Sequence, residues 1–145
     1  MIILPYAEKY RDDMIFMILQ AKDAMGRIPS INADLLDIEG NYLAKGDMFW
    51  IALNEKDRVI GCIGYSGTEN LDEAFLHRLY VKASEKHKGI GSALLLTAEN
   101  AMRKQGIRTV FVHLGAPKEQ WFESYAFYPK HGYTEYAPRY MRKDL

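Results

Sequence analysis

The sequence has almost no cysteine. Cys62 is the only one among 145 residues, so no disulfide can form within the chain, which is typical of a reducing compartment. Long apolar runs are also missing, since a membrane-spanning helix needs about 20 apolar residues. The first residues, MIILPYAEKYRDD, place a short apolar run ahead of a proline and charges, unlike a signal peptide. We therefore expect a cytoplasmic protein that does not bind membranes.

An excess of charge of either sign is absent too. The 19 Lys and Arg residues balance the 19 Asp and Glu residues, and the sequence pI is about 6.9. A neutral chain has no long-range attraction for nucleic acid, so any anion site must be local. The histidines show no zinc-ligand spacing and there is one cysteine, so we expect no metal site.

What the chain does have is apolar content. Hydrophobic residues make up 48% of it, enough for one domain over 1–145 to bury a core without crosslinks. Apolar spacing and turn residues predict the elements in order. They are a strand at 2–6, helices at 11–26 and 30–46, a hairpin of 49–53 and 58–65, a strand at 73–81, a helix ending before Gly106, a strand at 109–114, a helix at 121–130 and strands at 133–136 and 140–143.

The strand at 73–81 is predicted to alternate strictly. Its odd-numbered residues, from Glu73 to Val81, would share one face, and its even-numbered residues the other. A helix separates this strand from the one at 109–114. Because such a crossover joins parallel strands, we expect these two strands to pair in parallel.

The stretch KHKGIGS, from Lys86 to Ser92, lies between that strand and that helix. A helix N-terminus leaves backbone N–H groups unpaired, and glycines let a phosphate approach them. No lysine follows Gly91 as in a Walker loop, and Leu94 stands where a Rossmann fingerprint needs its third glycine. From spacing alone, a phosphate site and a plain tight turn both remain open.

Two motifs together resemble one family. Lys86 to Gly91 resembles the Gln/Arg-x-x-Gly-x-Gly/Ala acetyl-CoA loop of the GCN5-related N-acetyltransferases (GNATs), and Phe127 to Tyr133 resembles their Phe-Tyr-x-x-x-Gly-Phe motif. The resemblance implies the α/β GNAT fold: a central mixed, mostly antiparallel twisted sheet of about six to seven strands with a V-shaped splay, flanked by about four helices. Lys86 departs from the usual Gln or Arg, and Trp121 stands where many relatives carry an asparagine.

The resemblance also implies a function, the transfer of an acetyl group from acetyl-CoA, as cosubstrate, to a primary amine of a small molecule or protein. Tyr128 matches the general acid of the family. Glu73 and His77 are candidate bases, because Phe75 stands where some relatives carry a glutamate, and a water chain is an equal alternative. The implied cofactor-binding residues are Leu79, Tyr80, Val81, Lys86, His87, Lys88, Gly89, Ile90, Gly91 and Ser92.

Other interpretations stay open. Two alternatives are a non-catalytic module that binds acyl-CoA or CoA and regulates a partner, and a simpler nucleotide-binding protein. By resemblance, the acceptor site is bounded by 22–43 and 115–125, where Trp121, Phe122 and Tyr125 are candidates to line it. We expect Cys62 to be a buried structural thiol and the transfer to be direct. The sequence does not identify the acceptor amine, and it fits a monomer or a homodimer.

Overall fold

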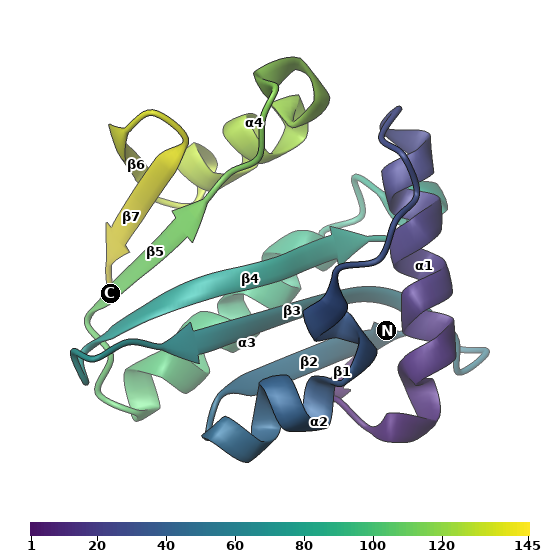
Figure 1. Cartoon of the computed structure of the whole chain (residues 1–145), viewed down its shortest axis with the longest axis horizontal. Coiled ribbons are helices and arrows are strands. Elements are labelled where there is room, and N and C mark those ends of the chain that lie inside the picture. Colours follow the sequence, from purple (N-terminus) through teal and green to yellow (C-terminus); the bar gives the residue numbers. More distant parts are fainter.

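The computed structural model describes residues 1–145 as one seven-stranded sheet with helices on both faces (Figure 1). The strands are β1 (Ile2–Pro5), β2 (Met48–Leu53), β3 (Val59–Gly67), β4 (Glu73–Val81), β5 (Thr109–His113), β6 (Thr134–Ala137) and β7 (Tyr140–Asp144). The α-helices are α1 (Arg11–Ala24), α2 (Ile38–Asn41), α3 (Ile90–Lys104) and α4 (Phe122–Lys130). None of the helices is long and apolar enough to cross a bilayer.

The sheet is mixed and mostly antiparallel, as predicted. Its order is β1-β2-β3-β4-β5-β7-β6, and only β4 and β5 are parallel. These two strands pair over three residues, ending at Phe75 opposite Phe111, and then diverge. Figure 1 shows β5 leaving the direction of β4 beyond this point. The gap between them is the expected V-shaped splay, and it leaves the second half of β4 without a strand on one side.

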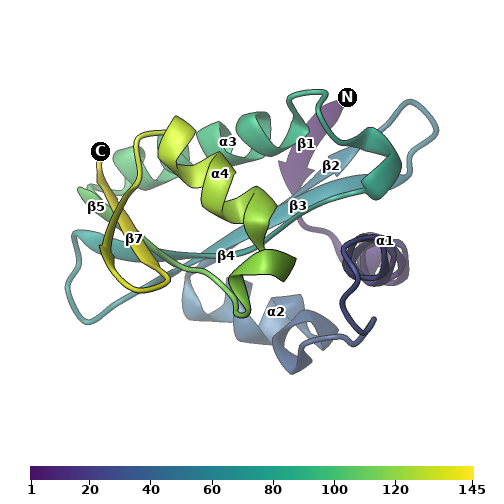
Figure 2. The same cartoon turned by 90° about the horizontal axis from the view of Figure 1, so that it is seen from above.

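Each face of the sheet carries its own apolar core (Figure 2). Helices α3 and α4 cover one face, while α1 and α2 cover the other. Helix α3 buries Leu94, Leu95, Ala98 and Met102, which lie on one side of a helix as their spacing predicted. Burying a leucine side chain fully contributes roughly 1.5–3 kcal/mol, so this stripe fixes α3, and with it the loop before it, against the sheet.

The strict alternation expected for β4 is wrong after His77. Arg78 has a φ of 56°, and the register against β3 shifts between Cys62 and Gly64. This β-bulge inserts one extra residue, and an extra residue moves all later side chains to the opposite face. Leu79 and Val81 therefore pack in the core under α3, together with the even-numbered residues Ala74 and Leu76.

The prediction of a single helix at 30–46 is also wrong. The segment forms three short pieces instead: a 3₁₀ turn η2 (Ala33–Leu36), helix α2 and a 3₁₀ turn η3 (Leu43–Lys45). Asp37 interrupts the helical pattern, with a φ of −144° and a ψ of 80°, and its carboxylate accepts a hydrogen bond from the Gly40 N–H at 3.0 Å. An aspartate favours capping a new helix over continuing an old one. The other predicted elements are confirmed within a few residues.

Candidate active site

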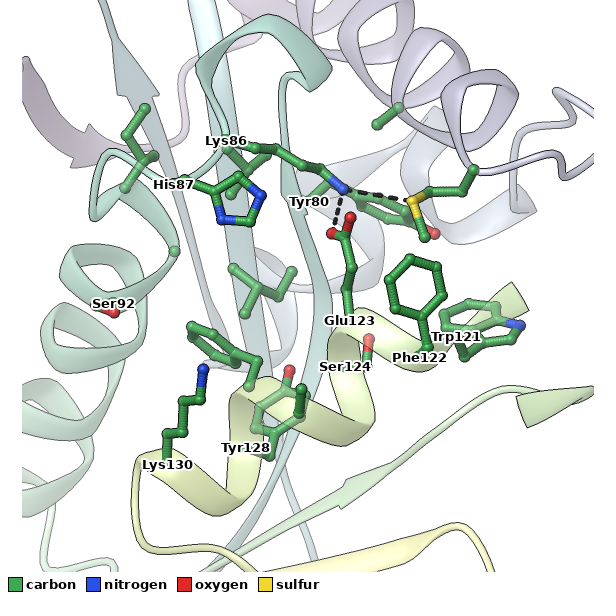
Figure 3. Close-up of a pocket in the computed structure, with 18 of the residues that line it drawn as sticks. Tyr80, Lys86, His87, Ser92, Trp121, Phe122, Glu123, Ser124, Tyr128 and Lys130 are labelled. Atoms are coloured by element: carbon green, nitrogen blue, oxygen red, sulfur yellow. Dashed lines mark hydrogen bonds and ion pairs between the residues drawn. The ribbon is translucent and has the colours of Figure 1, made fainter. Parts of the chain in front are cut away.

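A pocket of about 470 Å³ lies between β4, the loop 82–89, the start of α3 and helix α4 (Figure 3). All the residues expected to bind the cofactor line it, with one exception. Lys88 instead pairs with Glu85, at 2.9 Å between the ammonium and the carboxylate. Tyr128, the expected general acid, lines the same pocket. The structure thus brings together two motifs that are separated by helix α3 and strand β5.

The glycine stretch requires glycine at one of its two glycine positions. Gly89 has a φ of 82°, a left-handed conformation that favours glycine, just before α3 begins. A Cβ at Gly91 would lie 3.4 Å from the ring of Phe127, which is an ordinary van der Waals contact, so an alanine fits at this position. The first hydrogen bond of α3 runs from the Ala93 N–H to the Gly89 carbonyl. The N–H groups of residues 90–92 therefore have no partner in the helix, and unpaired N–H groups at a helix N-terminus favour an anion.

The second half of β4 has a free edge beside the pocket. The Lys82 N–H donates to the Ile60 carbonyl on β3 at 2.8 Å. In an antiparallel ladder alternate residues point their backbone groups to opposite neighbours, so those of Val81 and Leu79 point away from β3. On that side β5 has already diverged. These backbone groups are available to an extended ligand.

Tyr128 is a buried tyrosine whose hydroxyl has no partner in the chain. Its side chain is 5% exposed, and its hydroxyl makes no hydrogen bond with the rest of the chain. Figure 3 shows the hydroxyl pointing into the pocket. Burial raises the pKa of Tyr128, so the hydroxyl keeps its proton at neutral pH. The rings of Phe127 and Tyr133 contact it edge-on, with centroid distances of 5.2 and 5.3 Å.

Two side-chain pairs in the pocket were missed by sequence reasoning. Lys86 forms an ion pair with Glu123 of α4, at 2.5 Å. Arg27 stacks on Trp121, with 3.8 Å from the guanidinium carbon to the ring centroid. Neither Glu123 nor Arg27 belongs to a motif, and each partner is distant in the sequence, so no local signal marks them. Trp121 and Phe122, which were candidates to line the acceptor site, line this pocket, whereas Tyr125 does not.

The two candidate bases lie outside the residues that line the pocket. Glu73 is opposite Thr109, where β4 and β5 are still paired, and it accepts a hydrogen bond from Asn70. His77 comes two residues after the last β4–β5 pair, next to the start of the gap. Burial lowers the pKa of His77, which keeps the imidazole neutral, and its Nε2 lies 2.7 Å from the Ser66 hydroxyl.

The bulge in β4 is held from the other face of the sheet. The Arg78 guanidinium donates two hydrogen bonds to the Asp34 carboxylate, at 2.8 and 3.1 Å, and the Tyr42 hydroxyl donates a third at 2.6 Å. Burial tends to raise the pKa of Asp34, but these hydrogen bonds outweigh it and the pKa lies below its usual value. Asp34 is therefore a partner of Arg78 and is not free to attract a cationic acceptor.

Cys62 is fully buried under the same bulge. Its thiol donates to the Arg78 carbonyl, with 3.3 Å between sulfur and oxygen. Burial raises the pKa of Cys62 to about 12, so the reactive thiolate is not populated at neutral pH. The residue does not line the pocket. These features are those of a structural thiol.

Residues 45–135 match the family model described as "Acetyltransferase (GNAT) domain", which covers more than half of the chain. The chain belongs to this family of acetyltransferases. A curated relative, "Probable N-acetyltransferase 14" of Xenopus tropicalis, is 26% identical over 80 residues, or 55% of this chain. The chain covers 39% of that relative's length.

Solved structures share the fold over the whole chain. A GNAT-family acetyltransferase from Staphylococcus aureus Mu50 is 24% identical, with a TM-score of 0.88 over 99% of this chain and 98% of that one. The PaiA N-acetyltransferase from Thermoplasma acidophilum, in complex with coenzyme A, is 22% identical, with a TM-score of 0.76 over all of both chains. A Brucella melitensis GNAT acetyltransferase in complex with acetyl-CoA is 18% identical, with a TM-score of 0.71 over 99% and 87%.

Proposed function

We propose that this protein is an N-acetyltransferase that moves the acetyl group of acetyl-CoA directly to a primary amine of a small molecule or protein. The observation that carries the proposal is the position of the Tyr128 hydroxyl, which has no partner in the chain, in the same pocket as the free edge of β4 and the N-terminus of α3. Family membership supports acyl transfer. The family members from T. acidophilum and B. melitensis were crystallised with coenzyme A and acetyl-CoA.

The residues present fit acetyl-CoA. The unpaired N–H groups at the start of α3 suit its pyrophosphate, and Lys86 and His87 add donors nearby. The backbone groups of Leu79 and Val81 suit the amides of the pantetheine arm, which would pair with them in place of a neighbouring strand. Lys88 has a smaller part, because it does not line the pocket.

In the reaction, the amine nitrogen forms a bond to the thioester carbon, and the bond from that carbon to sulfur breaks. A backbone N–H such as that of Leu79 stabilises the oxyanion formed between these steps. The departing thiolate has a conjugate acid with a pKa of about 8.5, and Tyr128 protonates it. Tyr128 then recovers a proton from solvent.

The attacking amine must first lose a proton of its own. Of the two candidates on this chain, His77 is the better placed, because it is neutral and adjoins the gap between β4 and β5. Glu73 lies where the two strands are still paired. A water chain to solvent serves the same purpose without a dedicated base.

The first test is a thermal melt against increasing acetyl-CoA, with ADP as the control ligand. A ligand that binds only the folded protein raises the melting temperature with its concentration. A rise with acetyl-CoA that ADP does not reproduce supports the proposed pocket. Absence of any rise would remove acetyl-CoA as the cosubstrate.

The second test separates catalysis from binding, using acetyl transfer to a panel of primary amines. Tyr128→Phe removes only the hydroxyl, so we expect kcat to fall roughly 10²-fold or more while the Kd for acetyl-CoA stays within about twofold of wild type. A non-catalytic CoA-binding module would show no turnover before the substitution and no change after it.

A further inference from the structure

An ion pair crosses the proposed cosubstrate pocket. Lys86 comes from the loop after β4, and Glu123 from the first turn of α4, which is the facing wall. Figure 3 shows the two side chains meeting within the pocket, where the Lys86 ammonium also contacts the sulfur of Met25 at 3.6 Å. The side chains of Lys86 and Glu123 are 22% and 36% exposed. The pair is thus within reach of any ligand that enters the pocket.

The acidic residues of the pocket are both paired with lysines. The pocket lining contains two acids, Glu85 and Glu123, and each is paired with a lysine of the glycine loop. Lys88 does not line the pocket, so Lys86 is the lysine of this loop that does. Glu123 neutralises it. A carboxylate beside Lys86 opposes the binding of a phosphate there. It repels the phosphate, and it occupies the N–H donors of the lysine ammonium.

We propose that Glu123 sets the affinity for coenzyme A by competing with the ligand's phosphates for Lys86. When the pocket is empty, Glu123 holds the lysine. When coenzyme A binds, Lys86 turns toward the phosphate, and when the product coenzyme A leaves, Glu123 takes the lysine back. Glu123 therefore weakens product binding. This inference rests on the proposed function, since it requires coenzyme A to bind in this pocket.

A plain structural role predicts a different result. An acid in the first turn of a helix is stabilising in itself, because it faces the positive end of the helix dipole. If that were the whole role of Glu123, its removal would loosen α4, which carries Tyr128, and coenzyme A would bind less tightly or equally well. Competition predicts tighter binding instead, so the direction of the change separates the two roles.

The experiment is the Kd of coenzyme A, measured by isothermal titration calorimetry on the full chain. Glu123→Gln keeps the shape of the side chain and removes its charge. We expect coenzyme A to bind roughly two- to fivefold more tightly, the range of a partly exposed ion pair, and we expect the gain to shrink as salt is raised from low ionic strength. The control is Glu119→Gln. Glu119 is an exposed acid in the 3₁₀ turn Lys118–Gln120, just before α4, and it has no ion pair, so its substitution should leave the Kd unchanged.

A double-mutant cycle tests whether the effect passes through the lysine. Lys86→Gln should weaken coenzyme A binding, and adding Glu123→Gln to it should give a smaller gain than in the wild type. An unchanged or higher Kd in Glu123→Gln, with normal binding by the wild type, would overturn this inference alone. If the wild type fails to bind coenzyme A at all, this inference and the proposed function both fail.

Discussion

Replacing Asp34 by asparagine should remove most of the clamp on the β4 bulge. The carboxylate accepts two hydrogen bonds from Arg78 and one from Tyr42, and all three donors face it. An asparagine keeps one acceptor oxygen and presents an NH₂ group to donors on its other side. Arg78 then loses its counter-ion and part of its hydrogen bonding while its backbone stays in a left-handed conformation.

The size of the loss follows from the burial of the pair. Breaking a fully buried ion pair costs about 3–5 kcal/mol, and an exposed pair is worth about 0–1 kcal/mol. The side chains of Arg78 and Asp34 are 31% and 27% exposed, between these limits but with strong bidentate geometry. We expect Asp34→Asn to lower the free energy of unfolding by about 2 kcal/mol, which corresponds to a Tm lower by roughly 4–8 °C for a chain of this length.

The loss should depend on pH in one direction. The pKa of Asp34 is lower in the folded protein than in the unfolded chain, where it is about 3.9. Its stabilisation is therefore complete above the unfolded value and disappears as the pH falls through the folded value. The difference in unfolding free energy between wild type and Asp34→Asn should be constant from pH 7 to about 5 and should shrink below about 4.

Urea unfolding followed by circular dichroism at several pH values measures the loss of unfolding free energy in Asp34→Asn and how that loss changes with pH. The matched control is Asp37→Asn, which alters the cap of α2 but no contact with a cation. It should cost about 1 kcal/mol or less. Two results would refute the view that the Arg78–Asp34 pair stabilises the bulge. One is a loss of unfolding free energy in Asp34→Asn below about 0.5 kcal/mol at pH 7. The other is a difference between wild type and variant that is as large at pH 3 as at pH 7.

Two further predictions concern the same bulge. Because Arg78 has a φ of 56°, Arg78→Gly should be more stable than Arg78→Ala by about 1 kcal/mol in urea melts, and the opposite order would show that the left-handed conformation is not maintained. Cys62→Ala should retain turnover and lose about 1 kcal/mol of stability, and the native thiol should resist alkylation at pH 7 because its pKa is raised to about 12. A folded Cys62→Ala variant without activity would contradict direct transfer.

The sequence by itself determined most of the elements and their order. Residues that are close along the chain predict three features: the apolar stripe of α3, the hairpin of β2 and β3, and the crossover between β4 and β5. The same holds for the left-handed turn at Gly89 and for the motif around Tyr128. Local periodicity and turn chemistry decide these features, so they are readable without the fold.

The tertiary structure decided how those elements are adjusted to one another. Lys86 and Glu123 lie 37 residues apart, and Arg78 and Asp34 lie 44 apart, so neither pair leaves a local pattern in the sequence. The bulge at Arg78 depends on Asp34 and Tyr42 from another segment, and it reverses the faces of Leu79 and Val81. Long-range contacts of this kind form only when the chain is folded, because packing and charge pairing depend on distance in space and not on distance along the sequence.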